Sequence, residues 1–278
     1  MAYSAEDLQR YMDVATEAAS AGGAVRQHYW GNLSNIQQKG RPGDLVTEAD
    51  KAAEKEVLAV LNRHLPDHAI LAEESGMSLK PEGSETDSLL WAVDPLDGTT
   101  NYTHQYPFCG CSVGLLIDGK PAVGAIFDPV HNHLFRAAKG LGATCNREPI
   151  SVSSTDSLAD SLLVTGFAYD RRETIDNNYA EFCHLTHLTR GVRRGGAASI
   201  DLAYVACGRL DGYWERGLSP WDLAAGVILV EEAGGNVSAY DECPFDIRSG
   251  RLLATNSRIH GELSGALANI EPLARFAP

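Results

Sequence analysis

Short apolar runs separated by tight turns fill residues 110–140, and this pattern constrains the fold more than any other feature. Residues 113–117 and 122–127 flank Asp118-Gly119-Lys120, a sequence typical of the turn of a β-hairpin. A further apolar run at 134–138 predicts another strand. We therefore expect the middle of the chain to form an antiparallel meander.

The order of the remaining elements indicates the fold class. Helices and short strands precede the meander, whereas strands and helices alternate after Ser161, so we expect an α+β half (1–150) followed by an α/β half (151–278). The chain lacks a linker rich in Pro, Gly or Ser, so the two halves are expected to pack as one unit. We expect helices at 5–30, 47–65, 172–188, 197–207 and 220–233, and strands outside the meander at 69–72, 89–93, 162–165 and 211–214.

Composition and charge exclude several classes of protein. The longest apolar stretches, such as 227–230, fall far short of the ~20 residues of a membrane helix. The first thirty residues are rich in acidic side chains and lack an apolar core, so no secretory signal is expected. The net charge of −14 disfavours nucleic acid as a partner. Six scattered cysteines form no disulfide framework, which favours a cytoplasmic location.

Cysteine and histidine spacing offers no familiar metal motif. Cys109 and Cys111 lie two apart in an apolar run, so we expect both on one face of a strand, packed in the core. His131 and His133 share the same alternation. The chain has no CxxC spacing to complete a zinc motif, so surface or core roles are favoured over ligation.

The strongest chemical signal is the run from Asp94 to Asn101, which reads Asp-Pro-Leu-Asp-Gly-Thr-Thr-Asn. We expect a strand to end at Asp94, because the proline that follows holds it extended. Gly98 permits a turn that lets the carboxylates of Asp94 and Asp97 converge, where they would repel each other unless a divalent cation bound between them. The N–H groups of Gly98 and Thr99 predict a phosphate cradle at a helix start. The alternative is an Asx turn followed by a capped helix.

Two other acidic segments stand at the ends of expected elements. Glu73 and Glu74 follow an apolar run, at a position where loops often carry function. Ser219, Pro220 and Asp222 open a helix as N-cap, first residue and first-turn acid. Asp222 therefore has two interpretations, a ligand of a cation or a complement to the helix dipole.

Taken together, these segments resemble the inositol monophosphatase family. They occur in the family's order and spacing, and the similarity extends from Lys39 to about Asn256. The resemblance implies a layered αβαβα sandwich of the sugar-phosphatase type and a Mg²⁺-dependent, lithium-sensitive hydrolase of phosphate monoesters, active on myo-inositol monophosphate. The matching segments are Asp44-Leu45-Val46-Thr47-Glu48-Ala49-Asp50, Ala72-Glu73-Glu74-Ser75, Asp94 to Asn101 and Trp221-Asp222-Leu223-Ala224-Ala225-Gly226.

The resemblance also implies a set of metal ligands. One Mg²⁺ would bind Glu73, Asp94 and the carbonyl oxygen of Leu96. A second would bind Asp94, Asp97 and Asp222, and a third, weaker ion would lie near Glu73 through waters. Hard cations prefer oxygen ligands, and two of them roughly 4 Å apart can hold the attacking and leaving oxygens of a displacement at phosphorus.

By the same similarity, Glu73 and Thr99 would orient a water activated by the metal. Asp50 would accept a hydrogen bond from Thr99, and Lys39 would lie near the metals. The substrate would contact Asp97, Gly98, Thr99, Arg193, Gly196, Ala197, Ala198, Glu215 and Asp222. Among these, Glu215 would accept hydrogen bonds from ring hydroxyls, and Arg193 would be a substrate-side arginine.

Alternatives remain open at the level of substrate and of class. Relatives with almost the same metal ligands hydrolyse histidinol phosphate, or sugar phosphates that include fructose 1,6-bisphosphate. Arg41 adds a positive charge beside Lys39 that could favour a second phosphate. A non-enzymatic alternative is a regulatory module that binds a partner such as transcription machinery. The expected partners are a small phosphomonoester and a second copy of the chain as a homodimer, without direct nucleic acid or membrane binding.

Overall fold

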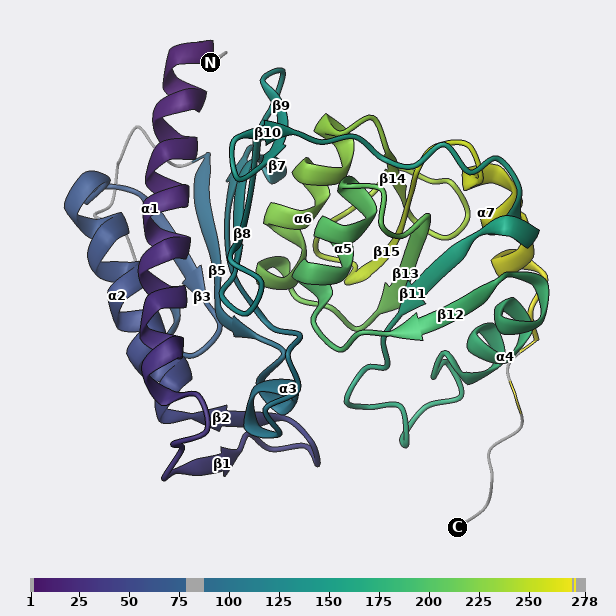
Figure 1. The fold of residues 1–278 in the computed structure, drawn as a ribbon, viewed down its shortest axis with the longest axis horizontal. Helices are drawn as coiled ribbons and strands as arrows, with labels where there is room; N and C mark the ends of the chain where they lie inside the picture. The colour runs from purple at the N-terminus through teal and green to yellow at the C-terminus, as the bar shows by residue number, and fades with distance from the viewer. Residues whose placement is uncertain (1–2, 79–87, 272, 274–278) are drawn as a thin grey trace.

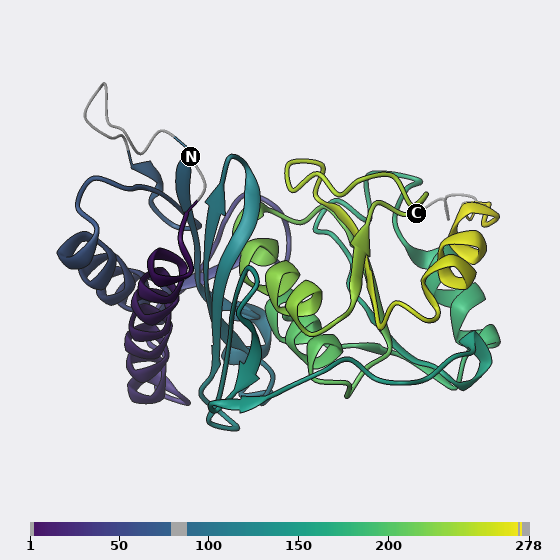
Figure 2. The ribbon, with the colours of Figure 1, turned by 90° about the horizontal axis from the view of Figure 1, so that it is seen from above.

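The computed structural model describes residues 3–78, 88–271 and 273 of the 278-residue chain. Five layers follow one another across the molecule in the order helix, sheet, helix, sheet, helix (Figure 1). Figure 2, turned by 90°, shows the same succession from above. The αβαβα sandwich implied by the resemblance is confirmed. In the described part of the chain, no helix has the length and apolar character needed to cross a membrane.

The first layer consists of α1 (Ala5–Tyr29) and α2 (Glu48–His64). Each helix begins with a capping box, in which Ser4 pairs with Asp7 and Thr47 pairs with Asp50. The apolar faces of both helices are buried against the larger sheet. The short strands β1 (Ile36–Gln38) and β2 (Leu45–Thr47) connect them as a separate antiparallel pair.

The second layer is a sheet of eight strands in the order β10-β9-β8-β7-β6-β5-β3-β4. All neighbours pair antiparallel except β3 and β5, and the expected meander is confirmed as β6, β7 and β8. The strands are β3 (Ala69–Ala72), β4 (Gly76–Ser78), β5 (Leu89–Asp97), β6 (Gly110–Ile117), β7 (Lys120–Asp128), β8 (His133–Ala138), β9 (Gly142–Cys145) and β10 (Glu148–Pro149).

The third layer, α5 (Ala198–Ala206) and α6 (Pro220–Glu232), lies between the two sheets. Two glycines let α6 approach the larger sheet closely. A Cβ on Gly114 would lie 2.6 Å from the Ala224 Cβ, and one on Gly124 would lie 2.6 Å from the Ala225 Cα. This close packing fixes the first turn of α6, and with it Asp222, near the end of β5.

The last two layers come from the C-terminal part of the chain. The five-stranded sheet has the order β12-β11-β13-β15-β14, and α4 (Tyr179–Leu188) and α7 (His260–Ala268) cover its outer face. Its strands are β11 (Leu162–Thr165), β12 (Gly191–Arg194), β13 (Gly212–Arg216), β14 (Asn236–Ser238) and β15 (Arg251–Thr255). The expected boundary at residue 150 falls between β10 and a 3₁₀ turn at Leu158–Asp160, and the division into two halves stays a prediction.

Three local expectations were wrong. The helix expected at 172–188 begins only at Tyr179, because Asn178 adopts a left-handed backbone (φ 68°) and residues 166–178 form a loop. Strand β5 does not end at Asp94 but continues, with an irregular register, to Asp97. Cys109 lies just outside β6, although it is buried like Cys111.

Candidate functional site

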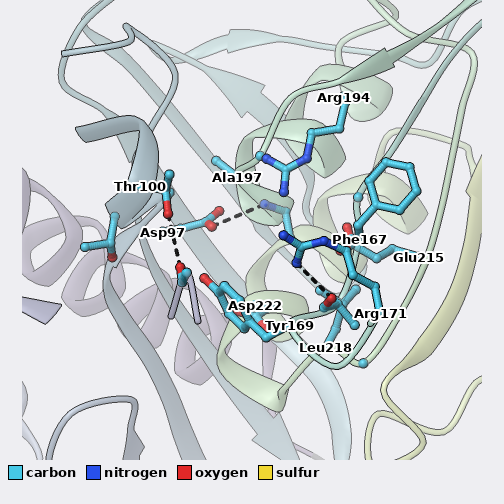
Figure 3. A pocket seen from close by; sticks show the side chains of 18 residues that line it. Asp97, Thr100, Phe167, Tyr169, Arg171, Arg194, Ala197, Glu215, Leu218 and Asp222 are labelled. Carbon is cyan, nitrogen blue, oxygen red and sulfur yellow. Dashed lines mark hydrogen bonds between the residues drawn. The ribbon is translucent and has the colours of Figure 1, made fainter. Parts of the chain in front are cut away.

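A cavity of about 330 Å³ lies where the end of β5 meets the first turn of α6. Five carboxyl groups and one amine line it, namely those of Asp44, Glu73, Asp94, Asp97, Asp222 and Lys39. A second cavity of about 220 Å³ shares Asp97, Thr99 and Asp222 with the first (Figure 3). The structure thus brings together acidic residues from four separate segments of the sequence.

Asp94 and Asp97 occupy the irregular end of β5 and are both nearly inaccessible to solvent. The Leu96 N–H donates to Asp94 Oδ1 at 2.8 Å, which stabilises the turn between the two carboxylates. Asp97 is held from the opposite side by the start of α5, where the N–H groups of Ala198 and Ser199 donate to it at 3.2 and 2.7 Å. The Ser199 hydroxyl donates a third hydrogen bond to the same carboxylate.

Asp222 enters the cavity from the first turn of α6. The Ser219 N–H donates to its Oδ2 at 2.7 Å, and Pro220 occupies the first helical position, where its missing N–H costs nothing. One carboxylate oxygen of Asp222 therefore caps the helix while the residue also lines the cavity, and its role as a cation ligand stays a prediction.

Glu73 and Glu74 follow β3 and meet Lys39 from the loop after β1. The Lys39 Nζ lies 2.9 Å from Glu73 Oε1 and also contacts Glu74. Burial lowers the pKa of Lys39, but the two carboxylates raise it by more, so its pKa lies above the ordinary value and the amine stays charged. Burial raises the pKa of Glu74 to about 7.

The remaining carboxyl groups raise one another's pKa values. Burial, followed by the charges of Glu73, Asp97 and Asp222, holds the pKa of Asp94 well above its ordinary value. Burial and the charges of Asp97 and Glu73 do the same for Asp222. Burial also raises the pKa values of Asp97 and Glu73. So many carboxylates in one small volume are stable only with bound protons or bound cations.

The donor set fits a hard divalent cation. It offers carboxylate oxygens and a backbone carbonyl, without sulfur or imidazole among the residues that line the cavity. Asp94 and Asp97 are buried and Asp222 is half-buried, and the like charges of these three acids face one another, a repulsion that a bound cation would offset.

Thr99 and Asp50 form a pair at the edge of this cluster. The Thr99 hydroxyl donates to Asp50 Oδ1 at 2.9 Å and lies 3.0 Å from the Leu96 carbonyl oxygen. The other oxygen of Asp50 accepts from the N–H and hydroxyl groups of Thr47 at 2.8 and 2.5 Å. Asp50 is fully buried, so the capping box of α2 also anchors Thr99.

The second cavity has a wall built from glycines and alanines opposite the acids. Gly98 has φ +85°, and a Cβ there would lie 3.0 Å from the Phe108 carbonyl oxygen and 3.1 Å from the Ala197 Cβ. Only glycine therefore fits at this position. Gly196, Ala197 and Ala198 also line the cavity, and the substrate contacts that the resemblance implies for them stay a prediction.

Glu215 lies at the end of β13 with its carboxylate in the wall of the second cavity. The Tyr213 hydroxyl donates to Glu215 Oε2 at 2.6 Å. Burial raises the pKa of Glu215 to about 7, although the hydrogen bond from Tyr213 and the charge of Arg194 lower it.

The substrate-side role expected of Arg193 stays a prediction, whereas its neighbour Arg194 is the arginine that the cavity includes. Arg194, not Arg193, lines the second cavity, where its guanidinium group faces the space between Ala197 and Glu215 in Figure 3. Successive residues of β12 alternate in direction, so a shift of one residue moves the side chain to the other face. Arg193 belongs to neither of the two cavities.

The loop 166–178 supplies cavity residues that the sequence did not indicate. Phe167, Tyr169 and Arg171 line the second cavity, and Tyr169 also reaches the first. Arg216 anchors the loop by pairing with both oxygens of Asp170 at 2.7 and 2.8 Å. Because the sequence predicted a helix over part of this loop, it did not indicate that these residues line a cavity. The sequence did not indicate the contact of Ser199 with the site either, because its hydrogen-bond partner Asp97 lies 102 positions away.

Comparison with known proteins assigns the chain to a family. The model of the inositol monophosphatase family matches residues 7–271. The chain belongs to the inositol monophosphatase family. It is 60% identical to an inositol-1-monophosphatase of Synechocystis sp. over 96% of this chain and 91% of that protein. The solved structure of an inositol monophosphatase from Anabaena (Nostoc) sp. superposes with a TM-score of 0.87 at 62% identity, covering 96% of this chain and 98% of that one.

The chain is also similar to a protein of Pseudomonas aeruginosa named Nus factor SuhB. It is 39% identical over 95% of this chain and 97% of its own length. Membership in the inositol monophosphatase family makes the chain a phosphoric monoester hydrolase.

Proposed function

We propose that this protein hydrolyses myo-inositol monophosphate to inositol and inorganic phosphate. The observation that supports it most is the convergence of Glu73, Asp94, Asp97 and Asp222 on one cavity beside a second cavity with polar walls. The 60% identity to a protein named inositol-1-monophosphatase supports the choice of substrate.

The proposal assigns the cations to the acidic cavity. Glu73, Asp94 and the Leu96 carbonyl oxygen would hold one Mg²⁺, Asp94, Asp97 and Asp222 a second, and Glu73 would lie near a third. When bound, Mg²⁺ supplies positive charge that offsets the negative charge of the phosphate and of the leaving alkoxide. Asp97→Asn removes the charge of one metal ligand and should therefore abolish turnover while the protein keeps its fold.

Thr99 and Glu73 orient the attacking water in this proposal. The Thr99 hydroxyl has a single proton, and Asp50 Oδ1 accepts it at 2.9 Å. The Thr99 oxygen is then left as an acceptor for a proton of the water. Lys39 holds Glu73 in place by its ion pair at 2.9 Å, so the Glu73 carboxylate is the second hydrogen-bond acceptor for the water.

Phosphate and ring would be recognised by different walls. The N–H groups of Gly98 and Thr99, at the start of α3 (Thr99–Thr103), face the phosphate. Gly196, Ala197 and Ala198 face the ring, and Glu215 accepts hydrogen bonds from ring hydroxyls. Arg194 and Arg171 line the same cavity. Two guanidinium groups there disfavour a cationic substrate such as histidinol phosphate.

A phosphate-release screen tests the proposal. Inositol 1-phosphate, histidinol phosphate, fructose 1,6-bisphosphate and glycerol 2-phosphate would be compared with Mg²⁺ and with EDTA, for the unmodified protein and for Asp97→Asn. We expect the highest kcat/KM for inositol 1-phosphate and no activity in EDTA or in the variant. A higher kcat/KM for histidinol phosphate or fructose 1,6-bisphosphate would transfer the assignment to that substrate.

The proposal has four further parts. The bound ion is Mg²⁺, Li⁺ inhibits the reaction, the protein forms a homodimer, and it is located in the cytoplasm. The ion preference is supported by the all-oxygen donor set. Lithium sensitivity follows from the same set, since Li⁺ also prefers oxygen. Light scattering tests the dimer, and cell fractionation tests the location.

The relative named Nus factor SuhB favours a second candidate, binding of a protein partner. Such binding needs no metal ligand, so Asp97→Asn would keep it while losing hydrolysis. A pull-down with transcription proteins that succeeds equally with both forms would support this second function.

A further inference from the structure

A cluster of one aspartate and two histidines lies at the turn between β7 and β8, apart from the acidic cavity. Asp128 ends β7, His133 begins β8, and His131 lies in the turn. One ligand atom from each residue falls within 4.8 Å of the other two. The sequence favoured surface or core roles for the histidines, because it gave no indication that Asp128 would join them.

The carboxylate of Asp128 is fixed in place. It is 1% exposed, and its Oδ1 accepts from the N–H groups of Val130 and His131 at 2.9 and 3.1 Å. These bonds define the turn and leave Oδ2 facing His131 Nδ1 at 2.7 Å. Because the backbone of the turn holds the carboxylate, a cation would bind a preformed ligand.

The two imidazoles lie side by side next to this carboxylate. Their ring centroids are 5.8 Å apart and the planes differ by 13°. Asp128 and His133 are direct cross-strand partners, so the sheet itself sets the separation of two of the three ligands.

Arg209 is the feature that opposes a cation here. Its Nη1 lies 3.5 Å from His133 Nδ1, and its guanidinium group stacks on Tyr204 at 4.6 Å. The contact with His133 is at the limit of a hydrogen bond, whereas the stacking gives the guanidinium group a separate anchor. A cation would therefore compete with Arg209 for His133 without displacing Arg209 from Tyr204.

We propose that Asp128, His131 and His133 bind one transition-metal ion of the zinc class. Two imidazole nitrogens and one carboxylate oxygen suit Zn²⁺ or Cu²⁺, whereas Mg²⁺ prefers oxygen alone. The ion would join the end of β7 to the start of β8 and stabilise the turn. This site is independent of hydrolysis, since none of its ligands lines the acidic cavity.

Electron paramagnetic resonance of the Cu²⁺-loaded protein distinguishes this site from the acidic cavity. With Mg²⁺ in excess to occupy the oxygen ligands, one equivalent of Cu²⁺ is expected to show nitrogen splitting from two imidazoles. His131→Gln and His133→Gln should each change that spectrum and lower Zn²⁺ affinity, measured by chelator competition, roughly tenfold or more. His184→Gln and His187→Gln remove an exposed pair on α4 and serve as matched controls.

The same measurements give the refuting results. Unchanged Zn²⁺ affinity and unchanged nitrogen splitting in both His131→Gln and His133→Gln would overturn the proposal, as would equal losses in the controls. His131 is 43% exposed, so its replacement is expected to leave the metal-free melting temperature unchanged. Arg209→Met, which removes the competing charge, should raise Zn²⁺ affinity, and a lowered affinity would also count against the site.

Discussion

Replacing Glu215 by glutamine should change stability and activity in opposite directions. Burial raises the pKa of Glu215 from 4.5 to about 7, so the folded protein binds a proton there that the unfolded chain has already lost. Stability contributed by this group is therefore present below about pH 4.5, falls as the pH rises, and is fully lost above about pH 7.

The size of this effect follows from the shift. The pKa of Glu215 differs by about 2.5 between the folded protein (about 7) and the unfolded chain (4.5), which corresponds to a destabilisation of the folded state by roughly 3 kcal/mol above pH 7. Glutamine keeps an oxygen that accepts from the Tyr213 hydroxyl but has no charge to bury. After allowing for a weaker hydrogen bond, we expect Glu215→Gln to be more stable than the unmodified protein by about 1 to 3 kcal/mol at pH 8. Near pH 4.5 the difference should disappear.

Urea unfolding in EDTA at pH 5 and pH 8 measures this difference. The acids of the metal cavity are the same in both proteins, so their contribution cancels except for the repulsion between Glu215 and Asp222, whose loss in the variant acts in the same direction. Glu56→Gln, which removes an exposed glutamate from α2, is the control and should change neither curve. A variant that is less stable at pH 8, or a difference independent of pH, would refute the reasoning.

Activity should fall in the same variant because ring hydroxyls lose a charged acceptor. A lost hydrogen bond of about 1 to 3 kcal/mol corresponds to a ten- to hundredfold lower kcat/KM for inositol 1-phosphate. Glycerol 2-phosphate lacks the ring, so its hydrolysis should be nearly unchanged. Equal losses on both substrates would mean that Glu215 supports the metal cavity or the fold instead.

Further predictions concern the metal cavity and its edge. Asp97→Asn should lower kcat by orders of magnitude while the circular dichroism spectrum is kept, and full activity of this variant or of the protein in EDTA would contradict the metal proposal. Thr99→Val should lower kcat much more than it raises KM, and Asp50→Asn should do the same more mildly; a pure KM effect would make Thr99 a phosphate ligand only. Li⁺ should inhibit at saturating substrate in steady-state assays, and insensitivity would indicate a different cation site. Gly98→Ala should lower the melting temperature, because alanine is strained at φ +85°.

Local features of this protein were largely determined by its sequence. The starts of α1 and α2, the turn between β6 and β7, and the start of α6 were all predicted from adjacent residues, because each depends on hydrogen bonds within a few positions. The family resemblance identified the acids that the structure brings to one cavity. The roles of these acids in metal binding and catalysis stay predictions.

Contacts between distant segments were decided only by the tertiary structure. The hydrogen bonds from Ser199 to Asp97 join residues 102 positions apart, and the presence of Arg194 rather than Arg193 at the cavity depends on which of two successive side chains of β12 faces it. The loop 166–178 has helix-compatible residues, but Asn178 and its bonds to Thr165 and Trp214 stop the helix from starting earlier. Such outcomes depend on long-range packing, in which buried polar groups must find partners wherever the fold brings them.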